Sequence, residues 1–165
     1  MSVKILAIHV PEGKMPLSGE KPWKFANDYS AYFDAIIDGV QGKLFCNFYS
    51  GYQLDFCSAP WPWSIKVPQF LDDPAYDVCA GAHDVGFGLE GYVKGLGRKL
   101  KAGEVDDIIR GGWRCWGMSR FFASTSDFFL VFAHTKRHWG ADQYKCKEKA
   151  ELVWVPNVVT WSAIV

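Results

Sequence analysis

The chain has 165 residues, and its 18 basic and 18 acidic side chains give a formal net charge of zero. Hydrophobic residues form 49% of the sequence and aromatic residues 16%, which excludes a disordered chain and supplies enough apolar surface for one buried core. The balanced charge excludes general electrostatic binding of nucleic acid, and it favours a partner or a homo-oligomer because neutrality lowers solubility. We therefore expect a single domain over residues 1–165.

Five cysteines stand singly in the sequence, without the C-x-x-C pair of a zinc knuckle. We expect five reduced thiols in a cytosolic protein. The apolar stretch within residues 1–10 is too short for a signal peptide, and no apolar run reaches the length of a membrane span. The sequence therefore predicts neither a signal peptide nor a transmembrane segment.

Residues 1–68 are predicted to form a β-rich region. Strands are expected at 3–10 and 43–49, where apolar residues alternate or β-branched residues are frequent. Residues 29–37 fit either a strand or a short helix, and their aromatic side chains favour the strand. The dipeptide Asp38-Gly39 is typical of a hairpin turn.

Residues 72–140 are predicted to be helical. Residues 72–74 (Asp-Asp-Pro) are typical of a helix start, and the helix is expected to run from 74 to about 87 before a run of glycines ends it. A second helix is expected from Gly103, because apolar residues recur there at helical spacing. Gly111-Gly112 in its middle either weaken this helix or permit close contact with another helix.

A third helix is expected from Ser124 or Ser126 to about Trp139. The tail, residues 150–165, is rich in β-branched residues and is expected to be an edge strand or an extended arm. Strands followed by helices indicate an α+β fold. We predict a mostly antiparallel N-terminal β region followed by about three helices.

The pair His83-Asp84 on the predicted first helix is the most informative motif. Neighbouring helix positions point about 100° apart, so these side chains cannot simply neutralise each other and each needs a partner from elsewhere. A second acidic pair, Asp106-Asp107, lies on the predicted second helix. We take Asp106, with Asp107 as the alternative, to orient His83 so that the neutral imidazole accepts a proton from water. The other interpretation is a structural histidine at a polar helix edge.

Three stretches together resemble a family of small phage and prophage proteins that is catalogued only as a domain of unknown function. Residues 51–60 resemble the family's G-F-x-x-D-x-x-S-x-P segment, residues 83–87 its H-D-x-x-Y motif, and residues 105–109 its A-D-x-x-F motif. Phe87 and Ile109 depart from the pattern. The resemblance implies a phage or prophage origin, and hence a place in the host cytoplasm or the virion, but it implies no activity.

A second likeness, limited to one motif, bears on chemistry. H-D-x-x-Y on one helix with an aspartate from another is similar to the site of secreted phospholipases. The likeness implies that His83 is the base, Asp84 a calcium ligand and Asp106 the orienting group. Phe87 lacks the hydroxyl that the phospholipase tyrosine gives to the orienting aspartate. A calcium ion would draw carboxylates from Asp84 and Asp55, although no D-x-D-x-D cage surrounds them.

Asp55 and Ser58 form a D-x-x-S sequence. Ser58 is either a nucleophile or substrate-binding hydroxyl, or part of a turn that Asp55 caps, and no G-x-S-x-G elbow surrounds it. Trp61 and Trp63 lie in a proline-rich stretch and are expected to form an exposed aromatic loop, which usually marks a partner.

Two further spacings have chemical meaning. Cys79 stands one helical turn before His83, which fits a nucleophilic pair or, more often, a packed core thiol. His134 and His138 share the spacing of a two-histidine metal site, but the glutamate of H-E-x-x-H is missing between them.

Three functions are compatible with these features. The first, which the family resemblance favours, is a virion-associated or assembly protein that docks through its aromatic loop. The second is a hydrolase in which His83 and Asp106 activate water for attack on lipid or a cell-envelope polymer. The third is a host-modulating binding protein in which the His-Asp pair is structural. The expected partners are accordingly a phage or host protein or a component of the cell envelope.

Overall fold

The computed structural model describes residues 2–18, 23–53, 74–115, 139–140 and 146–157. Its elements follow the chain in the order β1 (Val3–His9), β2 (Tyr29–Ile37), β3 (Val40–Phe48), α1 (Pro74–Gly88), α2 (Ala102–Cys115) and β4 (Ala150–Pro156). The α+β class with strands at the N-terminus is confirmed. The third predicted helix lies outside the described residues except for its expected last residue, Trp139, which is in a turn.

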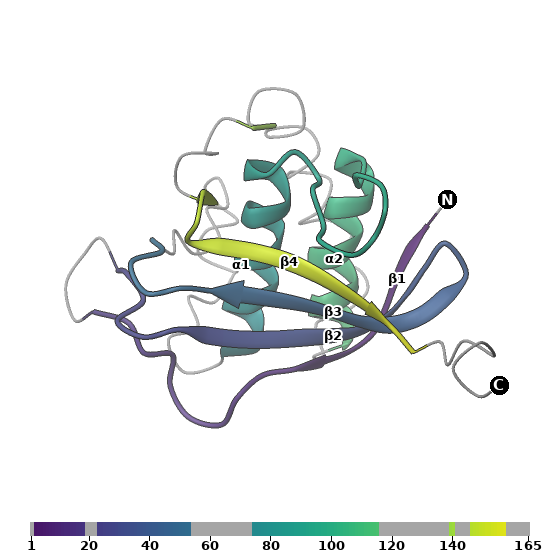
Figure 1. Ribbon diagram of the computed structural model, residues 1–165. Helices are drawn as coiled ribbons and strands as arrows, with labels where there is room; N and C mark the ends of the chain where they lie inside the picture. The colour runs from purple at the N-terminus through teal and green to yellow at the C-terminus, as the bar shows by residue number, and fades with distance from the viewer. Residues whose placement is uncertain (1, 19–22, 54–73, 116–138, 141–145, 158–165) are drawn as a thin grey trace, which may run out of the picture.

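The four strands form one antiparallel sheet in the order β1-β2-β3-β4 (Figure 1). The predicted hairpin turn joins β2 to β3, with Ile37 paired to Val40 and positive φ angles of 52° at Asp38 and 80° at Gly39. Such angles are typical of the tight turns that match the twist of a hairpin. The predicted tail strand is β4, which returns after both helices to pair with β3 at the edge of the sheet.

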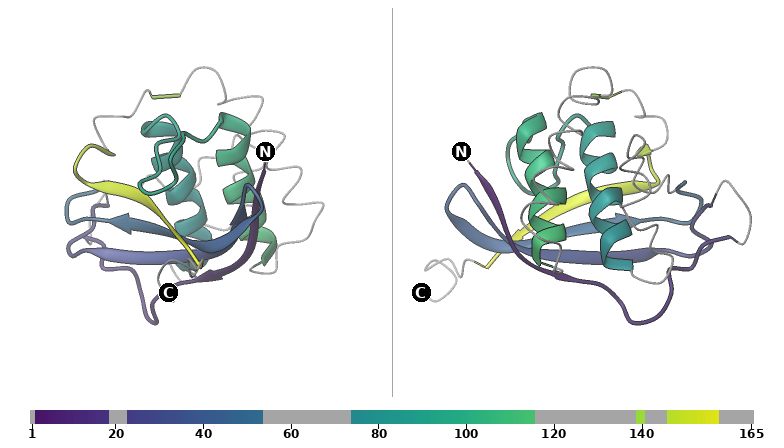
Figure 2. Two further views of the ribbon diagram at one scale, coloured as in Figure 1. Left: turned by 45° about the vertical axis from the view of Figure 1, so that its right-hand side comes forward. Right: turned by 180° about the vertical axis from the view of Figure 1, so that it is seen from behind.

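Both helices pack on the same face of the sheet (Figure 2). Alternate strand residues point to that face, as the period of a β-strand requires, and are buried there. The helices add apolar side chains to the same core. The largest fully buried side chains are Trp113, Phe25, Phe33, Phe48, Ile37, Leu44, Leu100, Ile108, Ile109, Leu152 and Val78.

The end of α1 is fixed by its own backbone. Glu90 has a left-handed φ of 53°, and its N–H donates to the carbonyl of Phe87 at 3.1 Å. The N–H of Gly91 donates to the carbonyl of Gly86 at 2.8 Å. These two bonds form a Schellman motif, which satisfies carbonyls that the helix end would otherwise leave unpaired.

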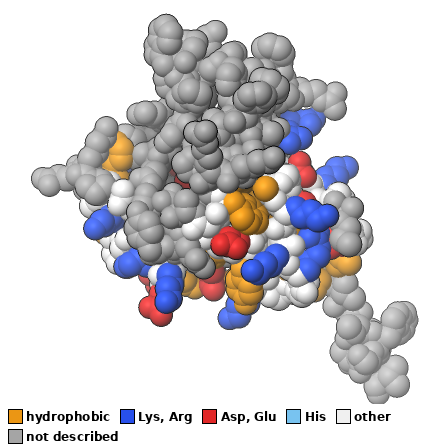
Figure 3. Space-filling model, turned by 90° about the horizontal axis from the view of Figure 1, so that it is seen from above, with side chains coloured by type: hydrophobic (Ala, Val, Ile, Leu, Met, Phe, Trp, Pro, Cys, Tyr) orange, Lys and Arg blue, Asp and Glu red, His pale blue; other side chains and the backbone are white. Residues whose placement is uncertain are grey.

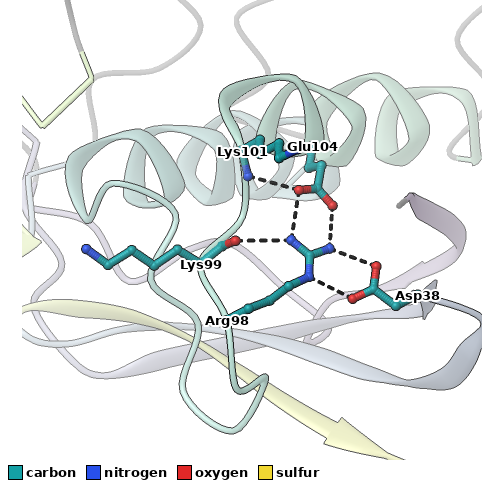
Figure 4. Close-up of polar contacts among 5 residues, drawn as sticks. All are labelled: Asp38, Arg98, Lys99, Lys101 and Glu104. Atoms are coloured by element: carbon teal, nitrogen blue, oxygen red, sulfur yellow. Dashed lines mark hydrogen bonds and ion pairs between the residues drawn. The ribbon is translucent and has the colours of Figure 1, made fainter.

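Arg98 joins the hairpin turn to the start of α2 (Figure 4). Its guanidinium donates to both carboxylate oxygens of Asp38, at 2.7 and 2.8 Å, and to both of Glu104, at 2.9 and 2.6 Å. A fifth bond, of 3.0 Å, goes to the carbonyl of Lys99. The N–H of Lys101 donates to Glu104 at 3.0 Å, which caps the first turn of α2. All five donors of the guanidinium are therefore used in holding three segments together.

Replacing Glu104 by Gln should destabilise the protein by about 2 kcal/mol at neutral pH. The substitution removes the negative charge that faces Arg98, and it puts an amide donor in place of one of the two oxygens that accept from Arg98 and the Lys101 N–H. The Arg98 hydrogen bond lowers the pKa of Glu104 below its ordinary value of 4.5, so its stabilisation is present above that value and is lost as the pH falls. Thermal denaturation at pH 7 and pH 3 checks this. The matched control, Glu148→Gln at an exposed position, should have little effect. An equal loss at both pH values would contradict the role given to Arg98.

Two glycines of α2 should respond oppositely to alanine. A Cβ at Gly112 would lie 2.5 Å from Cys79 Sγ and 3.2 Å from Phe33 Cε1, so Gly112→Ala should cost about 1–3 kcal/mol of stability. A Cβ at Gly103 meets nothing within 4 Å, so Gly103→Ala should leave stability unchanged or raise it by up to about 1 kcal/mol. Chemical denaturation of both variants measures the difference, and equal effects would show that α2 is not closely packed at Gly112.

Candidate functional site

His83 from α1 meets Asp106 from α2 in the interior of the protein. His83 Nε2 and Asp106 Oδ1 are 2.7 Å apart, and the two residues are only 4% and 1% exposed. This is the contact that the sequence predicted for the two helices.

Small residues allow the two helices to come this close. A Cβ at Gly86 would lie 2.6 Å from Val105 Cγ1, so only glycine fits there. Gly86 lies three residues, a little less than one turn, beyond His83, and Val105 directly precedes Asp106. Farther along the same interface, Gly112 lies against Cys79. The alternative that Gly111-Gly112 permit close contact with another helix is therefore confirmed at Gly112, while Gly111 faces Ile5 of β1.

The second ring nitrogen of His83 faces a carboxylate nearer the surface. Its Nδ1 lies 3.8 Å from Asp84 Oδ1, a distance too long for a hydrogen bond. The Asp84 side chain is 46% exposed, whereas the Asp106 side chain is 1% exposed. The imidazole thus has one nitrogen bound to a buried carboxylate and the other beside a half-exposed one.

Aromatic rings cover one side of the imidazole. The ring of Phe87 lies 4.5 Å from that of His83, and Trp139 meets Phe87 edge-on at 5.1 Å. The N–H of Gly140 donates to the carbonyl of Phe87 at 2.9 Å, which holds Trp139 beside the end of α1. Low polarity around the His83–Asp106 contact strengthens their electrostatic attraction.

The charge of His83 depends on two opposing effects. Burial disfavours the charged ring and lowers its pKa, whereas the hydrogen bond to Asp106 and the nearby carboxylate of Asp84 raise it. The balance raises the pKa of His83 from 6.5 to about 9. At neutral pH the ring is therefore protonated, and its Nε2–H donates to Asp106.

One oxygen of the site has no partner among the described residues. Asp106 Oδ2 is buried and accepts no hydrogen bond from them. Phe87, which stands where the phospholipase motif has a tyrosine, has no hydroxyl to offer. An unpaired buried carboxylate oxygen leaves more of its negative charge to act on His83.

The described residues do not fit a calcium site. Calcium takes six to eight oxygen ligands, and no group of three or more His, Cys, Asp or Glu side chains in the described part of the chain is arranged to hold a metal. Asp84 offers a single carboxylate, and the other predicted ligand, Asp55, lies outside the described residues. Calcium binding stays a prediction.

The remaining predicted residues fall into two groups. Asp107, the alternative partner of His83, is instead 3.4 Å from Arg110 and about a third exposed, so Asp106 is the member of the pair that faces the imidazole. Cys79 is a buried core thiol against Gly112. The roles of the following residues stay predictions, because they lie outside the described residues: Asp55, Ser58, Trp61, Trp63, His134 and His138.

The sheet carries a second His-Asp pair, which the sequence did not predict. His9 Nε2 lies 2.6 Å from Asp34 on the sheet face opposite the helices, and the ring of His9 stacks on Tyr32 at 4.5 Å. His9 and Tyr32 are directly paired across β1 and β2. The residues meet only because of the register of the two strands, so no local sequence motif predicts the pair. At 45% and 33% exposure the two side chains form a solvated surface contact.

One cleft and the distribution of charge describe the rest of the surface. A cleft lies between the loop at residues 14–18, Trp23, and Pro74 and Asp77 at the start of α1; neither His83 nor Asp106 lines it. On the face drawn in Figure 3, described basic side chains lie among acidic ones and do not form one basic patch. This fits the net charge of zero.

None of the helices in the described part of the chain is long and apolar enough to cross a membrane. No family model, curated protein or solved structure matches the chain.

Proposed function

We propose that the protein is a hydrolase in which His83, oriented by Asp106, takes a proton from the attacking water. This proposal rests on the different surroundings of the two ring nitrogens of His83. Its Nε2 is bound at 2.7 Å to a buried carboxylate, and its Nδ1 lies on the side of a half-exposed one. A histidine base needs this arrangement, with one nitrogen held and the other turned toward the reacting water.

The reaction begins with the neutral form of His83. Its Nε2–H donates to Asp106 Oδ1, which fixes the tautomer and leaves the lone pair on Nδ1. Nδ1 accepts a proton as the water attacks the electrophilic carbon of the substrate. Asp106 then stabilises the imidazolium, which returns the proton to the leaving group. Lipid esters and cell-envelope polymers are the substrate classes proposed, and the resemblance to phage proteins suggests a bacterial envelope as their source.

A second function deserves the same test. The low exposure of His83 and its contact with Phe87 favour a structural pair that ties α1 to α2 in a docking or assembly protein without catalysis. The two proposals differ in one respect: only the hydrolase requires the Nδ1 nitrogen of His83 to be chemically active.

Removing the imidazole should abolish hydrolysis. The assay uses lipid vesicles and peptidoglycan, each with and without Ca²⁺, and compares the wild type with the double variant His83→Gln, Asp106→Asn. The double variant replaces the ionic pair with two neutral amides, because removing one partner of a buried pair costs about 3–5 kcal/mol and endangers folding. Turnover should fall at least about 100-fold in the double variant, which is the lower range for loss of general-base catalysis.

The matched control is His9→Gln with Asp34→Asn, which makes the same changes in the pair on the opposite face of the sheet. This variant should keep full turnover. Turnover that survives in the first variant, or an absence of turnover in the wild-type protein, would favour the structural pair.

Catalysis and stability should depend on pH in opposite directions. His83 must lose its proton to act as a base, so kcat/KM should rise with pH and level off above about 9. The stabilisation that the charged pair contributes is fully present below pH 6.5 and is lost as the pH rises through about 9, because the folded-state pKa lies above the unfolded one. Steady-state kinetics of the wild type between pH 6 and 10 measure the first dependence. Thermal melts of the wild type and the double variant over the same range measure the second. A flat kcat/KM profile over this range would argue against His83 as the base.

A further inference from the structure

We propose that Asp84 determines the charge of the substrate that this site accepts. Its carboxylate stands beside the reactive edge of His83, and we infer that it favours substrates with a neutral or positively charged group next to the bond that reacts and disfavours negatively charged ones. The inference rests on the proposed hydrolase, because it concerns which molecules reach Nδ1.

The position of Asp84 supports this role. Its Oδ1 is 3.8 Å from His83 Nδ1, and its side chain is 46% exposed. The opposite nitrogen is closed off by Asp106, whose side chain is 1% exposed. A molecule that reacts at Nδ1 must therefore come within a few ångströms of the Asp84 carboxylate.

The charge balance of the site points the same way. With neutral His83 as the base, Asp84 and Asp106 leave the site with two negative charges. In the described part of the chain, no lysine or arginine forms an ion pair with Asp84, whereas Asp107 on the neighbouring helix lies 3.4 Å from Arg110. Among the described residues, the negative charge of Asp84 therefore acts on the approach to His83 without a basic partner. A single charge at such a distance in a half-exposed site changes the rate of reaction of a charged molecule by about three- to tenfold.

Three p-nitrophenyl esters with one leaving group test the proposal. They are the neutral acetate, the cationic trimethylammonioacetate and the anionic hemisuccinate, each assayed with EDTA present and divided by its rate in buffer alone. The ratio of cationic to anionic kcat/KM should fall about ten- to a hundredfold in Asp84→Asn, because the loss of the Asp84 charge slows the cationic substrate and speeds the anionic one, each by about three- to tenfold. The matched control, Asp107→Asn, should leave the ratio unchanged. Added salt should reduce the preference of the wild type, since salt screens exposed charges.

An unchanged ratio in Asp84→Asn, or an equal change in Asp107→Asn, would overturn the role of Asp84 while leaving the hydrolase intact. A second readout does not need turnover. With the thiols blocked, and at a pH above about 9 where the His83 ring is neutral, Nδ1 can displace iodide from neutral iodoacetamide or anionic iodoacetate. Peptide mapping then gives the ratio of the two adducts. Asp84→Asn should raise the share of the anionic reagent by about three- to tenfold.

The two failures are then distinct. Selective alkylation without ester turnover rejects the hydrolase and supports the charge selection by Asp84. Turnover without any effect of Asp84 on either ratio supports the hydrolase and rejects the selection. If His83 is neither alkylated nor active, its Nδ1 edge is closed and both proposals fail.

Discussion

The close approach of α1 and α2 is the constraint on which the site depends. His83 and Asp106 share a hydrogen bond of 2.7 Å at an interface where the two helices pack closely against glycine. Gly86 provides that space against Val105, and Gly112 provides it against Cys79. Burial then makes the contact strong, since a charged pair in low polarity gains more from its partner than one in water. Close packing at these glycines and the buried ionic contact therefore belong to one helix interface.

Much of the site could be predicted from sequence because it follows from helical periodicity. The Asp-Asp-Pro start at residues 72–74 predicted the first helix, and the spacing of apolar residues predicted the second. Because neighbouring helix positions point about 100° apart, His83 was expected to need a partner from outside its own helix. The choice between Asp106 and Asp107 depended on the rotation of α2 about its axis. Here the buried apolar side chains decide, since they turn Asp106 inward and leave Asp107 beside Arg110. The glycine run was expected to end α1, yet Gly86 lies inside the helix, because its small size is used for packing.

The remaining features depend on long-range register, which a single sequence does not contain. His9 meets Asp34 only because β1 and β2 pair in one particular alignment, and a shift of one residue would place them on opposite faces. Arg98 meets Asp38 across 60 residues for a similar reason: the fold brings a loop onto a hairpin turn. Neither contact has a local pattern. Composition and periodicity thus predict elements and their buried faces, while the contacts between distant elements require the fold itself.

The strand β4 has a consequence for how the chain is made. It pairs with β3, from which it is separated by both helices, and its Leu152 and Trp154 lie in the common core. In a chain emerging from the ribosome, β2 and β3 can pair early through their tight turn, but β4 cannot pair with β3 until residues 150–156 have been synthesised. During that interval an unpaired, apolar strand edge is available to other chains. Docking of β4 therefore closes the edge of β3 that would otherwise be open to pairing with other chains.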